Sequence, residues 1–127
     1  MGLRNLVSKT PRIAIKVEGC IVFIDPTEVI SVEAQGNYVL LVRSSGSYLL
    51  RACISALAEK LQPYSFIQVH RTVLVNASWV QEIQPCATGE YRLRTRNGKE
   101  YTVSRTYKKN LRSIAQSWIG NDALFAK

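Results

Sequence analysis

Long apolar segments are absent from this sequence of 127 residues. No uncharged apolar run approaches the roughly 18 residues that a membrane-spanning helix needs. The first residues, MGLRNLVSKTPR, contain neither a continuous apolar stretch nor a small-residue cleavage site, so we expect no secretory signal peptide. These absences predict a cytoplasmic protein rather than a membrane or secreted one.

Clustered metal ligands and catalytic pairs are also absent. The chain has one histidine, His70, and its three cysteines, Cys20, Cys53 and Cys86, are widely spaced without a C-x-x-C motif. No serine–histidine–acid or cysteine–histidine arrangement and no glycine-rich phosphate loop is recognisable. We therefore expect no metal, no cofactor and no enzyme activity. We expect the cysteines to be reduced thiols, mostly buried.

Proline, glycine and acidic residues are scarce. Four prolines and seven glycines, together with 46% hydrophobic residues, exclude a disordered or collagen-like chain and predict a single folded domain. Nine acidic residues stand against 17 lysines and arginines, which gives a formal charge of +8. A folded domain this basic is expected to bind an anionic partner, and nucleic acid or an acidic membrane surface comes first.

The positive charge is concentrated in one part of the chain. Residues 92–112 contain eight basic residues and one acidic residue, Glu100, and so hold +7 of the total +8. Concentrated cations next to polar loops are typical of proteins that bind a phosphate backbone. Within this stretch, the segment 104–109 combines an expected helix start with cations and hydroxyls, and the unpaired N–H groups of a helix start favour a phosphate.

Three arginines of the same stretch have two open interpretations. Arg92, Arg94 and Arg96 alternate along one expected strand and therefore share a face. A two-residue turn at Asn97-Gly98 would place Tyr101 on that face, where the arginine stems cover its ring. The three arginines belong either to a solvated face or to a binding surface.

The rest of the pattern predicts short strands and two helices. Apolar residues with helical spacing predict a helix over 54–61, which Pro63 ends. A last helix is expected after Ser104 as N-cap, with Gly120 as the glycine that follows its end. The apolar stripe of this last helix consists of Tyr107, Leu111, Ile114, Ala115 and Trp118. The expected strands are 12–18, 20–24, 29–34, 38–43, 48–51, 66–71, 73–75, 79–83, 90–96 and 99–103.

Four stretches of the sequence, in order, resemble the LytTR family of bacterial DNA-binding domains. The resemblance covers residues 12–115. Its second stretch contains the family's His-Arg-Thr run followed by apolar residues and an asparagine, and its fourth contains the family's Ser-Arg…Lys signature. The stretches are EVISVEAQGNYVLL, ISALAEKLQPYSFIQVHRTVLVN, WVQEI and NGKEYTVSRTYKKNL.

The resemblance implies a fold and a function. The fold is mainly β, with about ten short strands in small antiparallel sheets, one short mid-chain helix and a C-terminal helix. Family members insert loops, rather than a recognition helix, into the grooves of duplex DNA, usually as two copies on promoter direct repeats. They are bacterial transcription regulators, and most are the output half of a two-component response regulator with a receiver domain upstream.

The resemblance also implies an organisation of the chain. We expect residues 1–11 to be a linker or N-terminal arm, residues 12–119 to be the DNA-binding domain, and residues 120–127 to be a C-terminal tail. The chain is then either a free-standing member or an excised piece of a longer regulator with a receiver domain in cis.

The DNA-contacting residues follow from the same resemblance. Arg105 corresponds to an arginine that reads a base, and a bidentate pair with guanine is the commonest specific contact. Asn76 corresponds to a loop asparagine near phosphate and base, although by chemistry alone it reads as a turn residue. Lys108 and, less closely, Lys109 match positions that contact the DNA backbone. The expected contacts are Gln35, Asn37, Tyr38, Arg71, Thr72, Asn76, Ser104, Arg105, Lys108 and Lys109.

Some assignments stay open. Arg71 and Thr72 are either contacts or scaffold, and His70 is expected to be structural. A β-rich RNA-binding or protein-adaptor module would use the same basic patch, and it would stack single-stranded bases on exposed rings. The rings available for that alternative are Tyr38, Tyr48, Tyr64 and Tyr101, without the spacing of an RNP motif.

Overall fold

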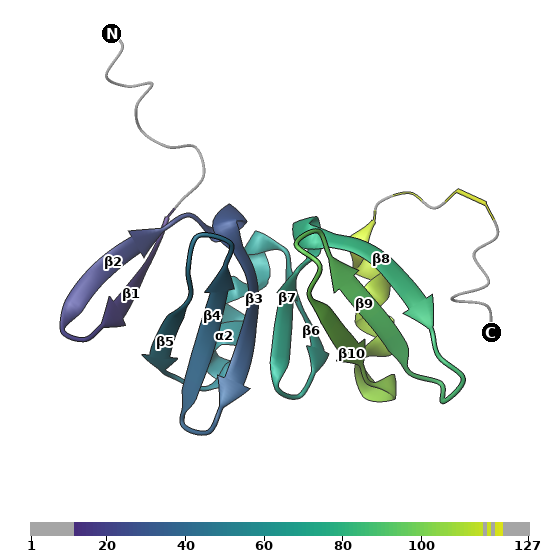
Figure 1. Cartoon of the computed structure of the whole chain (residues 1–127), viewed down its shortest axis with the longest axis horizontal. Helices are drawn as coiled ribbons and strands as arrows, with labels where there is room; N and C mark the ends of the chain where they lie inside the picture. Colours follow the sequence, from purple (N-terminus) through teal and green to yellow (C-terminus); the bar gives the residue numbers. More distant parts are fainter. Residues whose placement is uncertain (1–11, 116, 118, 121–127) are drawn as a thin grey trace, which may run out of the picture.

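The computed structural model describes residues 12–115, 117, 119 and 120. Within this part, the chain forms ten strands in three antiparallel sheets that lie side by side (Figure 1). The prediction of a mainly β fold with small antiparallel sheets is confirmed. The expected linker 1–11 and residues 121–127 of the expected tail lie outside the described residues.

Hairpins build each sheet. The two-stranded sheet pairs β1 with β2, which have the bounds Ile13–Val17 and Cys20–Ile24. The five-stranded sheet has the order β5-β4-β3-β7-β6, with the bounds Tyr48–Arg51, Tyr38–Arg43, Val29–Gln35, Val73–Asn76 and Phe66–His70. The three-stranded sheet has the order β10-β9-β8, with the bounds Glu100–Val103, Tyr91–Thr95 and Val80–Pro85.

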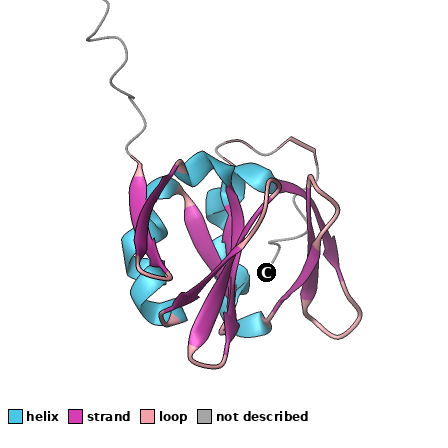
Figure 2. Cartoon of the chain, turned by 60° about the vertical axis from the view of Figure 1, so that its left-hand side comes forward, coloured by secondary structure: helices cyan, strands magenta, loops and turns pink. Residues whose placement is uncertain are grey.

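Helical segments connect and cover the strands. The expected mid-chain helix is α2, and its terminal apolar residues Ile54 and Leu61 are buried. Figure 1 shows α2 behind the five-stranded sheet, and Figure 2 shows the helical segments in cyan beside the strands in magenta. The bounds are Pro26–Glu28 for η1, Ile54–Leu61 for α2, Gln62–Tyr64 for η2, Ala77–Trp79 for η3 and Arg105–Ile114 for η4.

Two apolar clusters form the core, because successive residues of a strand point to opposite faces of its sheet. One cluster fills the space between the five-stranded sheet and α2, with Val32, Leu41 and Leu74 fully buried. The other cluster joins β6, β7, the three-stranded sheet and η4, and its residues are Val69, Val75, Tyr91, Leu93, Tyr101, Val103 and Leu111. The first cluster also packs apolar residues of β1 and β2, and the second takes residues from both larger sheets, so the two clusters connect the three sheets into one body.

The β9–β10 turn is longer than the sequence indicated. The Thr95 N–H donates to the Lys99 carbonyl at 2.9 Å, so residues 96–98 form a three-residue loop rather than a two-residue turn. Gly98 closes this loop with a φ of 90°, a conformation that glycine adopts without steric cost. Three-residue hairpin loops commonly end in such a residue, and the Asn-Gly pair fits both loop lengths.

The longer loop moves Tyr101 to the other face of the hairpin. A register change of one residue turns every side chain to the opposite face. Tyr101 accordingly pairs with Leu93 and is buried, while Arg94 lies opposite Glu100. The expected cover of arginine stems over Tyr101 is therefore wrong.

The C-terminal helix is confirmed, but it is shorter than expected. It is a 3₁₀ helix that begins after Ser104 and ends at Ile114, because Ala115 is already extended with φ of −123° and ψ of 144°. Gly120 therefore does not follow the helix end, which corrects the expectation, and Trp118 lies outside the described residues. Leu111 is the fully buried residue of this segment, so packing stabilises the turns around it rather than a longer stripe.

The cysteines differ from the prediction in their burial. Cys20 and Cys53 are exposed and Cys86 is half-buried, and all three are free thiols. The expectation of mostly buried thiols is wrong because Cys20 lies in the peripheral β1–β2 hairpin and Cys53 lies at the start of α2. No helix in the described part of the chain is long and apolar enough to cross a membrane.

Candidate nucleic-acid interface

Four loops from different sheets meet along one edge of the molecule, the lower edge in Figure 1. They are the turns between β3 and β4 and between β6 and β7, the loop between β8 and β9, and the segment that leads from β10 into η4. β3 and β6 are both antiparallel to β7, and β8 and β10 are both antiparallel to β9, so each pair runs in one direction. Figure 1 shows both pairs running toward this edge. We call residues 35–38, 71–72, 86–90 and 104–109 the turn edge.

Backbone hydrogen bonds fix the spacing of these loops. The Ala34 N–H donates to the Thr72 carbonyl at 2.8 Å, which ties the β3–β4 turn to the β6–β7 turn. The Ser104 N–H donates to the Val69 carbonyl at 3.0 Å, which ties the start of η4 to β6. Because sheet and inter-sheet bonds occupy the backbone, the loops present their side chains from a rigid frame.

His70 closes the β6–β7 turn. Its Nδ1 accepts the Thr72 N–H at 3.3 Å and lies 3.0 Å from the Thr72 hydroxyl. With Nδ1 accepting, the proton of a neutral ring is on Nε2. This arrangement gives His70 the structural role that we expected, and Arg71 at the tip of the turn is exposed.

The turn edge contains every expected contact except Asn76. Thr72 and Ser104 are half-buried at the bases of their loops. The exposed members are Gln35, Asn37, Tyr38, Arg71, Arg105, Lys108 and Lys109. Residues up to 74 positions apart in the sequence, from Gln35 to Lys109, thus present polar and cationic side chains along one edge.

Asn76 lies at the other end of β7, and its side chain is 2% exposed. Its Nδ2 donates to the carbonyls of Val29 at 2.9 Å and Pro26 at 3.3 Å. Its Oδ1 accepts the Ser78 N–H at 3.0 Å and caps η3. The interpretation of Asn76 as a turn residue is confirmed, and the structure does not bring it together with the other expected contacts.

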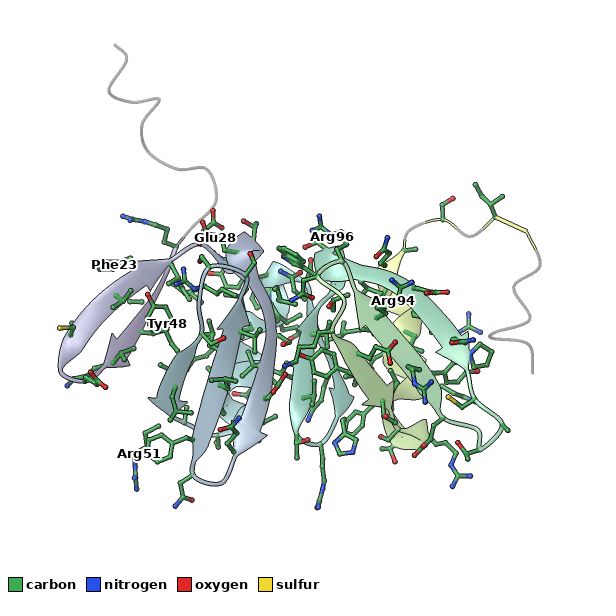
Figure 3. All side chains as sticks on the ribbon, viewed as in Figure 1. Phe23, Glu28, Tyr48, Arg51, Arg94 and Arg96 are labelled. Carbon is green, nitrogen blue, oxygen red and sulfur yellow. The ribbon has the colours of Figure 1, made fainter. Side chains whose placement is uncertain are left out.

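Acidic side chains form ion pairs with several cations of the β9–β10 hairpin, and Arg92 lies 3.8 Å from Glu100. Arg94 pairs with Glu82, and the Lys99 ammonium lies 3.2 Å from Glu33. The Arg96 guanidinium lies 4.3 Å from the centre of the Trp79 ring. Figure 3 shows Arg94 and Arg96 on the upper side of the molecule, away from the turn edge. For these arginines the geometry favours the solvated face.

The cations at the start of η4 are different. Arg105, Lys108 and Lys109 are exposed, and none forms an ion pair with an acidic side chain in the part of the chain that the structure describes. The Lys108 ammonium lies 5.8 Å from the centre of the Tyr91 ring. Within the turn edge, one acidic residue, Glu90 in the segment 86–90, stands against four basic residues, Arg71, Arg105, Lys108 and Lys109. The turn edge therefore carries a positive field with hydrogen-bond donors on its surface.

Comparison with known proteins identifies the family of the chain. Residues 19–116 match the family model of the LytTr DNA-binding domain. The chain belongs to the LytTR family. Sensory transduction protein LytT of Bacillus subtilis (strain 168) is 31% identical over 103 residues, 81% of this chain and 43% of that protein. Sensory transduction protein LytR of Streptococcus mutans serotype c is 25% identical over 84 residues, 66% of this chain and 34% of that protein.

A solved structure shares the fold. A LytTr DNA-binding domain from Bacillus cereus superposes on this LytTR domain with a TM-score of 0.70 at 20% sequence identity, over 84% of this chain and 97% of that one. The chain spans less than half the length of the curated relatives described above.

The sequence reasoning missed two features in this LytTR domain, one beside the turn edge and one within it. Arg51 ends β5 opposite Tyr38, with its guanidinium 5.9 Å from the centre of that ring, and Figure 3 shows it at the lower edge. The signal for Arg51 was the β4–β5 hairpin register, which the Ser44–Ser47 turn sets. Nothing in the sequence indicated that the β8–β9 loop lies next to Arg105. Gly89 and Arg105 are brought together only by the packing of the folded chain.

Proposed function

We propose that this LytTR domain binds duplex DNA sequence-specifically through the turn edge and regulates bacterial transcription from the cytoplasm. The observation that carries this proposal is the group of exposed cations, Arg105, Lys108 and Lys109, beside two acid-free turns on one rigid edge. Loops spaced by sheets can enter grooves without a recognition helix. The membership in a DNA-binding family supports the same conclusion.

Each part of the turn edge has a proposed role. Arg105 reads a guanine edge with two parallel hydrogen bonds, whereas Lys108, Lys109 and Arg71 bind phosphates. The turn 35–38 supplies further polar contacts to DNA through Gln35, Asn37 and Tyr38. Thr72 and Ser104 bind the sugar-phosphate backbone of the DNA. Asn76 supports the fold from the far end of β7 rather than contacting DNA.

The wider context is also a proposal. We infer that two copies of the domain bind direct repeats, and that a receiver domain precedes it in the full regulator. Two facts support this: the curated relatives described above are more than twice as long as their matched segments, and they are named sensory transduction proteins.

Two triple variants with equal loss of charge test the proposal. One variant replaces Arg105, Lys108 and Lys109 with glutamine, and its control replaces Arg94, Arg96 and Lys99 with glutamine. Binding to a random-sequence duplex is titrated at several salt concentrations, with a single strand as competitor. We expect the variant of Arg105, Lys108 and Lys109 to bind more weakly, with a smaller slope of log binding constant against log salt concentration. The control should bind nearly as the wild type does.

Two results would contradict the proposal. Equal losses in both variants would mean that net charge, and not the turn edge, drives binding. Tighter binding of the single strand than of the duplex would favour the alternative of an RNA-binding module, which uses exposed rings. Of the rings available to it, Tyr101 is buried and Tyr38 is 40% exposed.

A further inference from the structure

Gly89 lies directly under the side chain of Arg105. A Cβ atom at residue 89 would be 3.2 Å from Cδ of Arg105, and 3.9 Å from its Cγ and Nη1. Such a distance is tighter than ordinary van der Waals contact, so either the arginine stem or the loop must move. The other glycines with positive φ in the described part of the chain have nothing within 4 Å of such an atom. The close approach is therefore particular to Gly89.

The β8–β9 loop holds Gly89 in this position. The Cys86 N–H donates to the Glu90 carbonyl at 2.9 Å, and the Gly89 N–H donates to the Cys86 carbonyl at 3.1 Å. Gly89 has a φ of 92°, which places its backbone against the arginine stem without a side chain between them. Two residues later, the Tyr91 ring lies beneath the Lys108 ammonium. One short segment thus supports two cations of the turn edge.

We propose that Gly89 is a positioning residue for Arg105, and that the empty space above its Cα sets the direction of the guanidinium. This inference rests on the proposed function, because it concerns how Arg105 reads a base. An exposed arginine otherwise samples many rotamers, and ordering it on binding opposes association. A stem already seated on the loop backbone loses less freedom, and its planar fork starts closer to the orientation that a bidentate pair needs.

The positioning acts on specificity more than on overall affinity. A phosphate contact by a point charge tolerates a shifted side chain, whereas two parallel hydrogen bonds to a guanine edge do not. A bidentate pair contributes a discrimination of roughly five- to 150-fold against the wrong base. Displacing the Arg105 stem should therefore remove most of this preference at one base pair and leave non-specific binding in place.

The experiment compares Gly89→Ala with Gly19→Ala. Gly19 lies in the β1–β2 turn with a φ of 84° and open space around it, so this control carries similar backbone strain without the steric contact. A second pair, Gly89→Asn and Gly19→Asn, keeps the test usable where alanine prevents folding, because asparagine tolerates left-handed backbone better. Each variant is titrated with a preferred duplex, with its single-base variants and with a non-specific duplex. The order of the Arg105 Nε–H group is measured by NMR relaxation without DNA.

For Gly89→Ala we expect discrimination at one base pair to fall about tenfold, within the range of a single bidentate pair. We also expect unchanged non-specific binding and a more mobile Arg105 Nε–H. The Gly19 variants should match the wild type in all three. Wild-type discrimination with an equally ordered Arg105 in the Gly89 variants would overturn the positioning role. A wild-type chain that binds all duplexes alike would instead overturn the proposed function, and the NMR comparison would still decide whether Gly89 orders Arg105.

Discussion

At residue 76, an asparagine amide is used entirely inside the protein, and residue 37 presents the same side chain to solvent. Position in a motif pointed to both as DNA contacts. Burial separates them, because the Asn76 donors and acceptor already bind Val29 and Ser78. Sequence reasoning from chemistry alone had Asn76 as a turn residue, whereas the resemblance placed it at DNA. The course of β7 away from the turn edge and the internal hydrogen bonds of Asn76 favour the turn role.

We predict opposite outcomes for these two asparagines. Asn76→Ala removes a cap and leaves a buried carbonyl without its donor, so the free energy of unfolding should fall by about 2–3 kcal/mol. Asn37→Ala should change it by less than about 0.5 kcal/mol, as is usual at the surface, and weaken DNA binding instead. Chemical denaturation and duplex titration measure the two quantities. A stable Asn76→Ala domain with impaired binding would contradict the structural role.

Arg105 and Lys108 allow a test of base reading against phosphate binding. Arg105→Ala should cost about 1–3 kcal/mol of binding free energy and relax the preference at one base pair. Lys108→Ala, as the comparison, should weaken binding to all sequences alike and lower the salt slope by about 1. Binding to a panel of single-base duplex variants distinguishes these patterns. If Arg105→Ala weakens every duplex equally, Arg105 binds only phosphate.

At the scale of elements, the strands were predictable and the connections between them were less so. Alternation of apolar residues and turn signals located β1 to β10, since each strand has one face on a core cluster. The length of the β9–β10 loop was not predictable, because Asn97-Gly98 suits two- and three-residue loops alike. The end of η4 was missed because the sequence shows an apolar stripe but not the surface that the stripe must cover.

The register of β10 connects two sheets through Tyr101. Its hydroxyl lies 2.5 Å from Ser31 Oγ and donates to Glu33 at 2.6 Å, and both partners are on β3. Burial, and then the hydrogen bond to the Glu33 carboxylate, raise the pKa of Tyr101 well above its usual value near 10. The neutral hydroxyl is therefore the form that the fold retains.

We predict a loss of stability at alkaline pH that depends on Tyr101. Because the folded pKa is raised, the contribution is complete below pH of about 10, and it is lost above that pH as the unfolded chain ionises. Tyr101→Phe should lower the free energy of unfolding by about 1–2 kcal/mol at neutral pH. Above pH of about 10, the free energy of unfolding of this variant should fall less steeply with pH than that of the wild type. Denaturation measured between pH 7 and 11 checks this. If the free energy of unfolding falls equally steeply with pH in the wild type and in Tyr101→Phe, the role of Tyr101 is contradicted.

At the scale of the whole molecule, function depends on what the sheets bring together. The sequence located the excess charge in residues 92–112, but it did not separate the cations that acids neutralise from those at the start of η4. That separation depends on partners such as Glu33, which is 66 residues from Lys99 in the chain. The turn edge likewise arises because strands from two sheets run in one direction.

The central claim is that the turn edge reads a DNA sequence, and selection from random duplex DNA with the purified chain tests it most directly. The selection is run at two salt concentrations, so that binding to the phosphate backbone alone weakens at the higher one. We predict enrichment of a short motif, present singly or as direct repeats, that persists at the higher salt concentration. Salt-sensitive binding without an enriched motif would contradict the account and leave a basic edge without sequence readout.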